Sequence, residues 1–168
     1  MKGILQKIML WEGLLAGLIL FGAYTVPTAG QTNPEARLAA GKIASEIQWV
    51  TLDELQELNK KEPRKVFIDI YATWCGPCKL MDKKTFADPS IVDYVNQNYY
   101  AVKLNGEGKK QVNIFGKSMT EAELAYAFQI KGYPSTVFMT EELKPYQPVA
   151  GYIPAKEFLR MLKQFNEG

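Results

Sequence analysis

The sequence predicts an α/β domain in which helices cover both faces of a mixed central β-sheet. Three observations lead to this prediction. Residues 66–71 form a nearly continuous apolar, β-prone run, which is typical of a strand buried on both faces. Helix-start signals alternate along the chain with further strand candidates. Two cysteines, Cys75 and Cys78, follow the apolar run after a short turn, where a strand would lead into a helix.

The predicted elements follow one another without an internal repeat. Thr51 and Glu54 match a capping box, and Ser118 and Glu121 match a second one. Asp88 and Pro89 have the types preferred at a helix start. We expect strands at residues 47–50, 66–71, 99–104, 136–140 and 146–152, and helices at 52–61, 79–84, from 89, 118–129 and from 154.

Composition narrows the possible functions. The 168 residues allow one domain with a core plus a tail, and 47% of them are hydrophobic. The net charge is only +2, which argues against a nucleic-acid partner. The chain contains no histidine, so Ser-His-Asp and Cys-His catalysis and imidazole zinc sites are excluded. We expect no metal site.

The first thirty residues have the pattern of a targeting segment. Lys2 and Lys7 precede an apolar stretch, and residues 13–26 carry no charge. A membrane span needs about 20 apolar residues, whereas shorter runs are typical of signal peptides. We expect residues 1–30 to form a signal peptide or an uncleaved membrane anchor. In the second case, residues 8–26 would tether the protein to the membrane.

A buried core helix is a third interpretation of this segment, disfavoured because no amphipathic pattern marks a packing face. Both leading interpretations place the domain in the periplasm or otherwise outside the cytoplasm. Residues 31–47 are then a linker, and residues 48–168 form the folded domain.

The spacing of Cys75 and Cys78 favours redox chemistry over three alternatives. As a structural cross-link, a loop of this size would contribute only ~2 kcal/mol, against ~4.7 for a 100-residue loop. As a zinc site, the pair supplies half a ligand set. Inert buried thiols would not need Gly76 and Pro77 between them. At a helix N-terminus, by contrast, free N–H groups would favour a Cys75 thiolate, and Cys78 could attack a mixed disulfide one turn later.

Several separated segments resemble the thioredoxin superfamily, over residues 48–168. The segment Trp74-Cys75-Gly76-Pro77-Cys78-Lys79 is identical to the active-site signature of thioredoxins. The other matching segments are Asp69, Lys103-Leu104-Asn105, Gly132-Tyr133-Pro134-Ser135-Thr136, Gly151 and the final amphipathic helix. The resemblance implies the thioredoxin fold.

The resemblance also implies roles for these residues. Cys75 would be the nucleophile and Cys78 the resolving thiol. Asp69 would assist proton transfer at Cys78, with Lys103 tuning it, although a plain structural ion pair is the alternative. The Tyr133–Pro134 bond would be cis. The residues expected to contact substrate are Trp74, Gly76, Pro77, Tyr133 and Pro134.

Two departures from thioredoxins refine the resemblance. Residues 80–86 lack the kinking proline of thioredoxins, and residues 106–118 form a polar, Gly- and Lys-containing insertion. The run Lys83-Lys84-Thr85-Phe86-Ala87-Asp88-Pro89 instead resembles the C-terminal thioredoxin-like domain of bacterial membrane thiol:disulfide interchange proteins and secreted relatives. Tyr133 is bulkier than the residue usual before this proline.

We therefore expect a thiol–disulfide oxidoreductase that works as an exported protein-disulfide reductase. Its redox group would be the Cys75–Cys78 disulfide, with no other cofactor. Its partners would be protein thiols and disulfides and a membrane thiol electron donor, and the domain would be monomeric. Gly-Pro between the cysteines favours reduction, since thioredoxin has a potential of about −270 mV and a strong periplasmic oxidant about −120 mV. The alternatives are a disulfide oxidase or isomerase, and a chaperone-like binding module with incidental redox activity.

Overall fold

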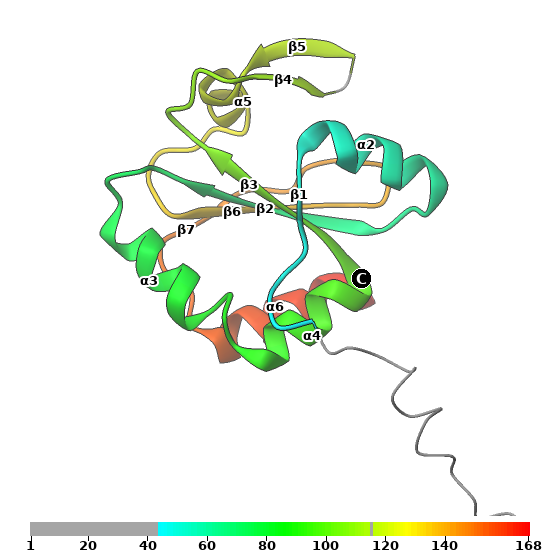
Figure 1. Ribbon diagram of the computed structural model, residues 1–168, viewed down its shortest axis with the longest axis vertical. Helices are drawn as coiled ribbons and strands as arrows, with labels where there is room; N and C mark the ends of the chain where they lie inside the picture. Colours follow the sequence, from blue (N-terminus) through cyan, green and yellow to red (C-terminus); the bar gives the residue numbers. More distant parts are fainter. Residues whose placement is uncertain (1–43, 115) are drawn as a thin grey trace, which may run out of the picture.

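The computed structural model describes residues 44–114 and 116–168 of the chain (Figure 1). The predicted targeting segment, its possible tether and most of the predicted linker lie outside the described residues. Within the described part, no helix is both long enough and apolar enough to cross a membrane. Ile47, the last residue of the predicted linker, is buried in the core of the domain.

A five-stranded mixed sheet forms the centre of the domain, in the order β1-β3-β2-β6-β7. The strands are β1 (Trp49–Val50), β2 (Lys65–Tyr71), β3 (Tyr99–Asn105), β6 (Ser135–Met139) and β7 (Val149–Ala150). Strands β1, β3 and β2 run parallel, whereas β6 is antiparallel to β2 and β7 is antiparallel to β6. The predicted mixed sheet is therefore confirmed.

Strand β2 lies in the middle of the sheet, as its apolar sequence predicts. Residues 66–70 are all buried, including the one carboxylate, Asp69. In the register of the sheet, Asp69 lies beside Lys103 of β3 on one side and Thr136 of β6 on the other. This row of polar residues crosses three neighbouring strands.

Helices cover both faces of the sheet (Figure 1). On one face, α2 (Leu52–Lys61) and α5 (Glu121–Ala127) bury apolar side chains such as Leu55 and Leu124. On the opposite face lie α3 (Gly76–Lys84), α4 (Pro89–Asn98) and α6 (Ala155–Glu167). Their core residues include Met81, Ile91, Val95, Phe158 and Leu162.

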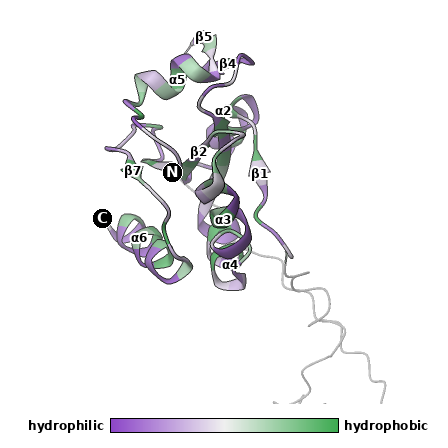
Figure 2. Cartoon of the chain, turned by 90° about the vertical axis from the view of Figure 1, so that its left-hand side faces the viewer, coloured by the Kyte–Doolittle hydropathy of each residue, from purple (hydrophilic) through white to green (hydrophobic). Residues whose placement is uncertain are grey.

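The colouring in Figure 2 shows the hydrophobic strand β2 between helices with hydrophilic outer surfaces.

Two helix starts follow the predicted capping chemistry. Thr51 accepts a hydrogen bond from the Glu54 N–H, and the Glu54 side chain accepts one from the Thr51 N–H, which completes a capping box for α2. Asp88 caps α4, and Pro89 occupies its first turn. Helix α3 begins at Gly76 with Cys75 as its N-cap, which confirms the expected helix start at the cysteines; the helical run predicted from residue 79 extends back to Gly76, because Pro77 is tolerated in the first turn of a helix.

The predicted helix at residues 118–129 is wrong at its start. Residues 111–120 instead form a hairpin of β4 (Gln111–Ile114) and β5 (Lys117–Thr120), so Ser118 lies in a strand. The capping box is shifted by two residues, with Thr120 as the cap and Glu123 reaching back to its N–H. Alternate residues Val112 and Ile114 are buried, which is the period of a strand with one face on the core.

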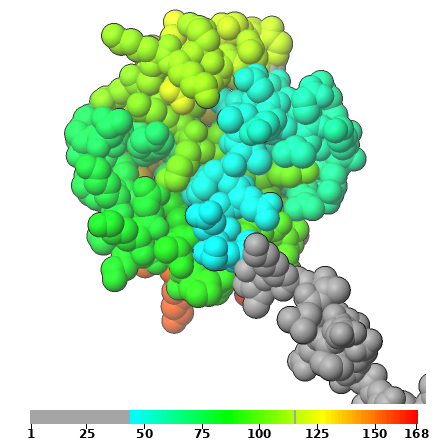
Figure 3. Space-filling view, in the orientation of Figure 1, coloured from blue at the N-terminus to red at the C-terminus, as the bar shows by residue number. Residues whose placement is uncertain are grey.

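The hairpin rests on α2, and at the top of Figure 3 the yellow-green segment adjoins the cyan one. Gln56 of α2 donates a hydrogen bond of 2.7 Å from Nε2 to the Asn113 carbonyl oxygen. Gly116 adopts a φ of 71°, which lets the chain turn between the strands. The predicted insertion is thus a folded addition to the domain.

The last strand is shorter than predicted. The sequence predicts a strand over residues 146–152, but β7 covers only Val149–Ala150. Pro148 precedes it and lacks the N–H that a longer ladder would need. Only an isolated bridge between Met139 and Pro145 extends the pairing.

Candidate active site

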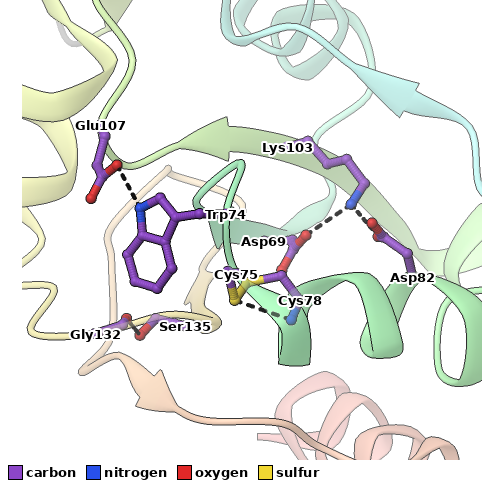
Figure 4. Close-up of a disulfide and its surroundings, with 9 residues drawn as sticks. All are labelled: Asp69, Trp74, Cys75, Cys78, Asp82, Lys103, Glu107, Gly132 and Ser135. Carbon is purple, nitrogen blue, oxygen red and sulfur yellow. Dashed lines mark hydrogen bonds and ion pairs between the residues drawn. A yellow bond between two sulfur atoms is a disulfide. The ribbon is translucent and has the colours of Figure 1, made fainter.

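Cys75 and Cys78 form a disulfide where β2 leads into α3 (Figure 4). Cys75 is the N-cap of α3, and its Sγ accepts a hydrogen bond of 3.1 Å from the Cys78 N–H. Both cysteines are at least 95% buried, whereas Gly76 and Pro77 are exposed. The first turn of the helix therefore points its free N–H groups at the Cys75 sulfur, the nucleophile that the resemblance implies.

Asp69 lies beside the cysteines in Figure 4 and forms an ion pair with Lys103. The Lys103 Nζ is 2.9 Å from Asp69 Oδ2 and also contacts Asp82 Oδ1 (Figure 4). Asp82 projects from α3, four residues after Cys78, so it lies one turn further on the same helix. One ammonium group thus bridges a buried carboxylate and an exposed one.

Burial has the largest influence on the pKa of the Asp69 carboxyl group. Its side chain is 3% exposed, and desolvation raises the carboxyl pKa above its ordinary value although Lys103 opposes this. Burial alone would lower the pKa of Lys103, but its contacts with Asp69 and Asp82 raise it overall. Lys103 therefore stays charged, while Asp69 can exchange a proton at a higher pH than an exposed aspartate.

Three aromatic rings surround the Lys103 ammonium. The ring centroids of Trp49, Phe86 and Tyr71 lie 4.6, 5.2 and 5.5 Å from Nζ. Aromatic faces attract a cation at such distances. The rings help to hold Lys103 between its two carboxylates.

The loop before β6 approaches the disulfide from the other side. Its Tyr133–Pro134 peptide bond is cis, as the resemblance implied. The Ser135 hydroxyl donates to the Gly132 carbonyl oxygen at 2.7 Å, and the Gly151 N–H donates to the Pro134 carbonyl oxygen at 2.8 Å. The Ser135 side chain and the backbone just after β7 thus hold the loop in place.

Trp74 lies exposed beside the disulfide and is held by two neighbours. Its Nε1 donates a hydrogen bond of 2.9 Å to Glu107, and its ring meets the Tyr133 ring edge-to-face at a centroid distance of 6.0 Å. A Cβ on Gly106 would lie 2.4 Å from the Tyr133 ring. Gly106 therefore leaves room for the bulky side chain before the cis proline.

All nine predicted site residues belong to this one region of the molecule. Sequence reasoning missed Asp82 and Glu107, which contact Lys103 and Trp74. The spacing of Asp82 from Cys78 was a usable signal, because residues four apart share a helix face. Nothing in the local sequence marks Glu107, which lies in the turn after β3 and reaches Trp74 only through the fold.

Comparison with known proteins identifies the family. The family model of the thioredoxin-like domain matches residues 52–166. The thiol:disulfide interchange protein DsbD of Actinobacillus pleuropneumoniae is 33% identical over 117 residues, which cover 68% of this chain. The match covers only 18% of that relative, and the DsbD of Haemophilus ducreyi is 31% identical with 22% of its length covered. The chain thus spans about a fifth of the curated relatives it matches.

Solved structures share the fold. An oxidoreductase named DsbH superposes with a TM-score of 0.57 at 18% identity, over 79% of this chain and 98% of that one. The oxidised C-terminal domain of DsbD from Neisseria meningitidis has a TM-score of 0.52 at 19% identity, over 67% of this chain and 90% of that one. The predicted thioredoxin fold is confirmed. With its Cys75–Cys78 pair, the chain belongs to the thioredoxin-like domain family of thiol–disulfide oxidoreductases.

Proposed function

We propose that the chain is an exported protein-disulfide reductase that works by dithiol–disulfide exchange. The observation that carries the proposal is the Cys75–Cys78 disulfide at the N-terminus of α3, with a buried carboxylate behind it and the cis-proline loop beside it. The name of the DsbD relatives, thiol:disulfide interchange protein, supports the reaction class. The two-electron chemistry is assigned to the cysteine pair itself.

The first step is attack by Cys75. In the reduced protein its thiolate forms a bond to one sulfur of the substrate disulfide, and the second substrate sulfur leaves as a thiolate that takes up a proton. The free N–H groups of the first turn of α3 stabilise the attacking thiolate. The product is a mixed disulfide between Cys75 and the substrate.

The second step is resolution by Cys78. Its thiol passes a proton to the Asp69 carboxylate, directly or through water, and the resulting thiolate attacks the Cys75 sulfur. The remaining substrate sulfur leaves as a thiolate, and the Cys75–Cys78 disulfide is formed. Lys103 neutralises Asp69 when it is charged, and Asp82 holds Lys103 in place. The substrate gains two electrons and the cysteine pair loses them.

The substrate surface consists of the exposed residues around the disulfide. An extended substrate segment would pair with the backbone of Tyr133 before the cis Pro134. Trp74, which is 68% exposed, would lie against it together with Gly76 and Pro77. Glu107 keeps the Trp74 indole in a defined place for this contact.

The proposal also covers the direction of the exchange reaction and the compartment in which the protein works. Gly76 and Pro77 between the cysteines favour a potential near that of thioredoxin, which suits a reductase. The apolar segment within residues 1–30 supports export to the periplasm or a comparable compartment. A reductase there needs an external source of electrons, for which we propose a membrane-bound thiol protein.

Trapping experiments test the proposed chemistry. Insulin serves as the model protein disulfide. For trapping, the full chain is reduced with dithiothreitol and freed of it before insulin is added; turnover is measured separately with dithiothreitol present. We expect Cys78→Ser to accumulate a mixed disulfide through Cys75, and Cys75→Ser to form none, with both variants at least about 100-fold slower in turnover. A mixed disulfide that forms through Cys78 instead would overturn the assignment. A double serine variant with full biological activity would establish the binding-module alternative.

A further inference from the structure

Two buried oxygen atoms near the disulfide lack a hydrogen-bond partner within the described residues. They are Oδ1 of Asp69 and Oγ1 of Thr136. Asp69 is 2% exposed and Thr136 is fully buried. An unpaired polar atom in the interior is costly, so such a pair next to a reactive site indicates a function.

The register of the sheet places the two side chains together. Asp69 of β2 lies directly opposite Thr136 of β6 in the antiparallel pair, so both point to the same face of the sheet. Opposite residues in such a pair have Cβ atoms about 4.5–5.5 Å apart. The flanking pair on that face, Phe67 and Phe138, lies in the core cluster that also contains Met81 of α3.

Lys103 leaves one side of the Asp69 carboxylate open. Its Nζ contacts Oδ2, from the β3 side. Oδ1 therefore remains available to a donor from the β6 side. Thr136 is the residue of β6 in register with Asp69, and its hydroxyl is one donor and two acceptors.

We propose that Thr136 is a positioning residue for Asp69: the Thr136 hydroxyl donates a hydrogen bond to one water molecule, which in turn donates to Asp69 Oδ1. This water bridge stabilises the carboxylate that takes the proton of Cys78. This inference rests on the role proposed above for Asp69. It adds a third member to the polar row, so that Lys103, Asp69 and Thr136 act together across three strands.

The groups around Asp69 determine in which direction its pKa shifts when the Thr136 hydroxyl is removed. Lys103 from β3 lowers its pKa, while Asp82 from α3 and burial raise it. Tyr71 of β2 contacts Lys103, and the cysteines lie above in α3. Strand β6 has no ionisable side chain. Loss of the Thr136 hydroxyl therefore raises the pKa of Asp69 further.

The test uses the two cysteines as their own reporters. Reduced full chain reacts with substoichiometric 5,5′-dithiobis(2-nitrobenzoate), and each step releases one coloured thiolate. The first phase reports attack by Cys75, and the second reports resolution by Cys78. The chain has only these two cysteines, so no other thiol contributes.

Thr136→Val removes the hydroxyl but keeps the β-branched shape. We expect the pH midpoint of the second phase to rise by ~0.5–1 unit, the change produced by one ordinary hydrogen bond. Thr136→Ser keeps a hydroxyl and should restore the wild-type midpoint. Thr136→Ala is a second variant without the hydroxyl, for use if the valine variant does not fold.

Thr85→Val is the matched control. Thr85 is fully buried in the same domain, but its hydroxyl already donates to the Ile153 carbonyl oxygen at 2.6 Å. This control should lower the free energy of unfolding and leave the pH midpoint unchanged.

The inference would be overturned if Thr136→Val kept the wild-type pH midpoint of the second phase and had a higher free energy of unfolding. The Thr136 hydroxyl would then be a buried group that forms no water-mediated hydrogen bond with Asp69. Failure of the proposed Asp69 role looks different. In that case Asp69→Asn would show the same second-phase pH profile as the wild type, and the inference would fall with that role.

Discussion

Asp69 is the residue on which the chemistry of the site most depends. It is a carboxylate inside a strand whose neighbours are apolar, and only Lys103 among the described residues forms an ion pair with it. Burial raises its pKa, which brings it closer to the pKa of a thiol and suits proton exchange with Cys78. The same burial means that the ionised carboxylate lowers the stability of the folded protein.

The first prediction concerns Asp69→Asn. The amide keeps the shape but cannot take a proton, so we expect resolution by Cys78 to slow at least about 10-fold while attack by Cys75 changes less. The two phases of the nitrobenzoate reaction measure both rates. Equal slowing of both steps would remove Asp69 from the proposed role.

The second prediction concerns Gly106, which makes room for Tyr133. In Gly106→Ala the new methyl group would press on the Tyr133 ring, and we expect a loss of about 1 kcal/mol in the free energy of unfolding. In a Tyr133→Val background the same change should cost nothing, because the ring is gone. Urea unfolding of the four proteins measures the coupling, and an equal loss in both backgrounds would disprove the contact.

Most of the site residues could be predicted from sequence because they lie within short, recognisable segments. Asp69 stands six residues before Cys75, and its charge in an apolar strand was itself a signal. Glu107 and Thr136 could not be predicted in the same way. Their positions beside Trp74 and Asp69 depend on a turn and on strand register, which no local pattern specifies.

At the scale of elements, α5 shows how two capping signals compete. Ser118–Glu121 and Thr120–Glu123 have the same spacing, and local sequence does not choose between them. The β4–β5 hairpin decides, because Val112 and Ile114 are buried and Ser118 is needed in the strand opposite Asn113. Tertiary packing thus overrides a sound local rule.

The third prediction uses the two candidate caps as a matched pair. Thr120→Ala should lower the free energy of unfolding by about 1 kcal/mol, since it removes the acceptor for the Glu123 N–H. Ser118→Ala, at an exposed strand position, should stay within about 0.5 kcal/mol of the wild type. Urea titrations of the two variants compare them, and the opposite ranking would restore the earlier helix start.

At the scale of the whole molecule, Asp69 links stability to pH. Its pKa is raised in the folded state, so the folded protein holds this proton at pH values where the unfolded chain has lost it. The resulting stability is complete below the ordinary aspartate pKa and is lost as the pH rises through the raised one. The pKa values of other carboxyl groups are lowered, among them those of Glu54, Asp88 and Glu123. Their contribution to stability is therefore present at neutral pH and is lost as the pH falls.

The fourth prediction follows from this linkage. Above pH 4 the free energy of unfolding of the oxidised wild type should fall relative to Asp69→Asn, by about 1.4 kcal/mol for each pH unit up to the folded-state pKa. Urea unfolding at a series of pH values measures the difference. Parallel curves for the two proteins would contradict the assignment of a raised pKa to Asp69.

The overall architecture was predictable because the periodic patterns are strong. The buried strand at residues 66–71 and the amphipathic final helix mark the centre of the sheet and one helical layer, and the resemblance supplied the thioredoxin fold. The hairpin could not be predicted, since β4 and β5 are short and polar outside Val112 and Ile114. Short strands of this kind depend on the surface they pack against, here α2.

The reduction potential of the Cys75–Cys78 pair tests the central claim most directly. The full chain would be equilibrated with dithiothreitol or glutathione buffers, and the fraction of disulfide measured. We predict a value near or below about −220 mV, towards the thioredoxin end of the range, as expected for a reductase with an external electron source. A value near −120 mV would mean that the reduced form is strongly stabilised, and would contradict the reductase assignment in favour of an oxidase.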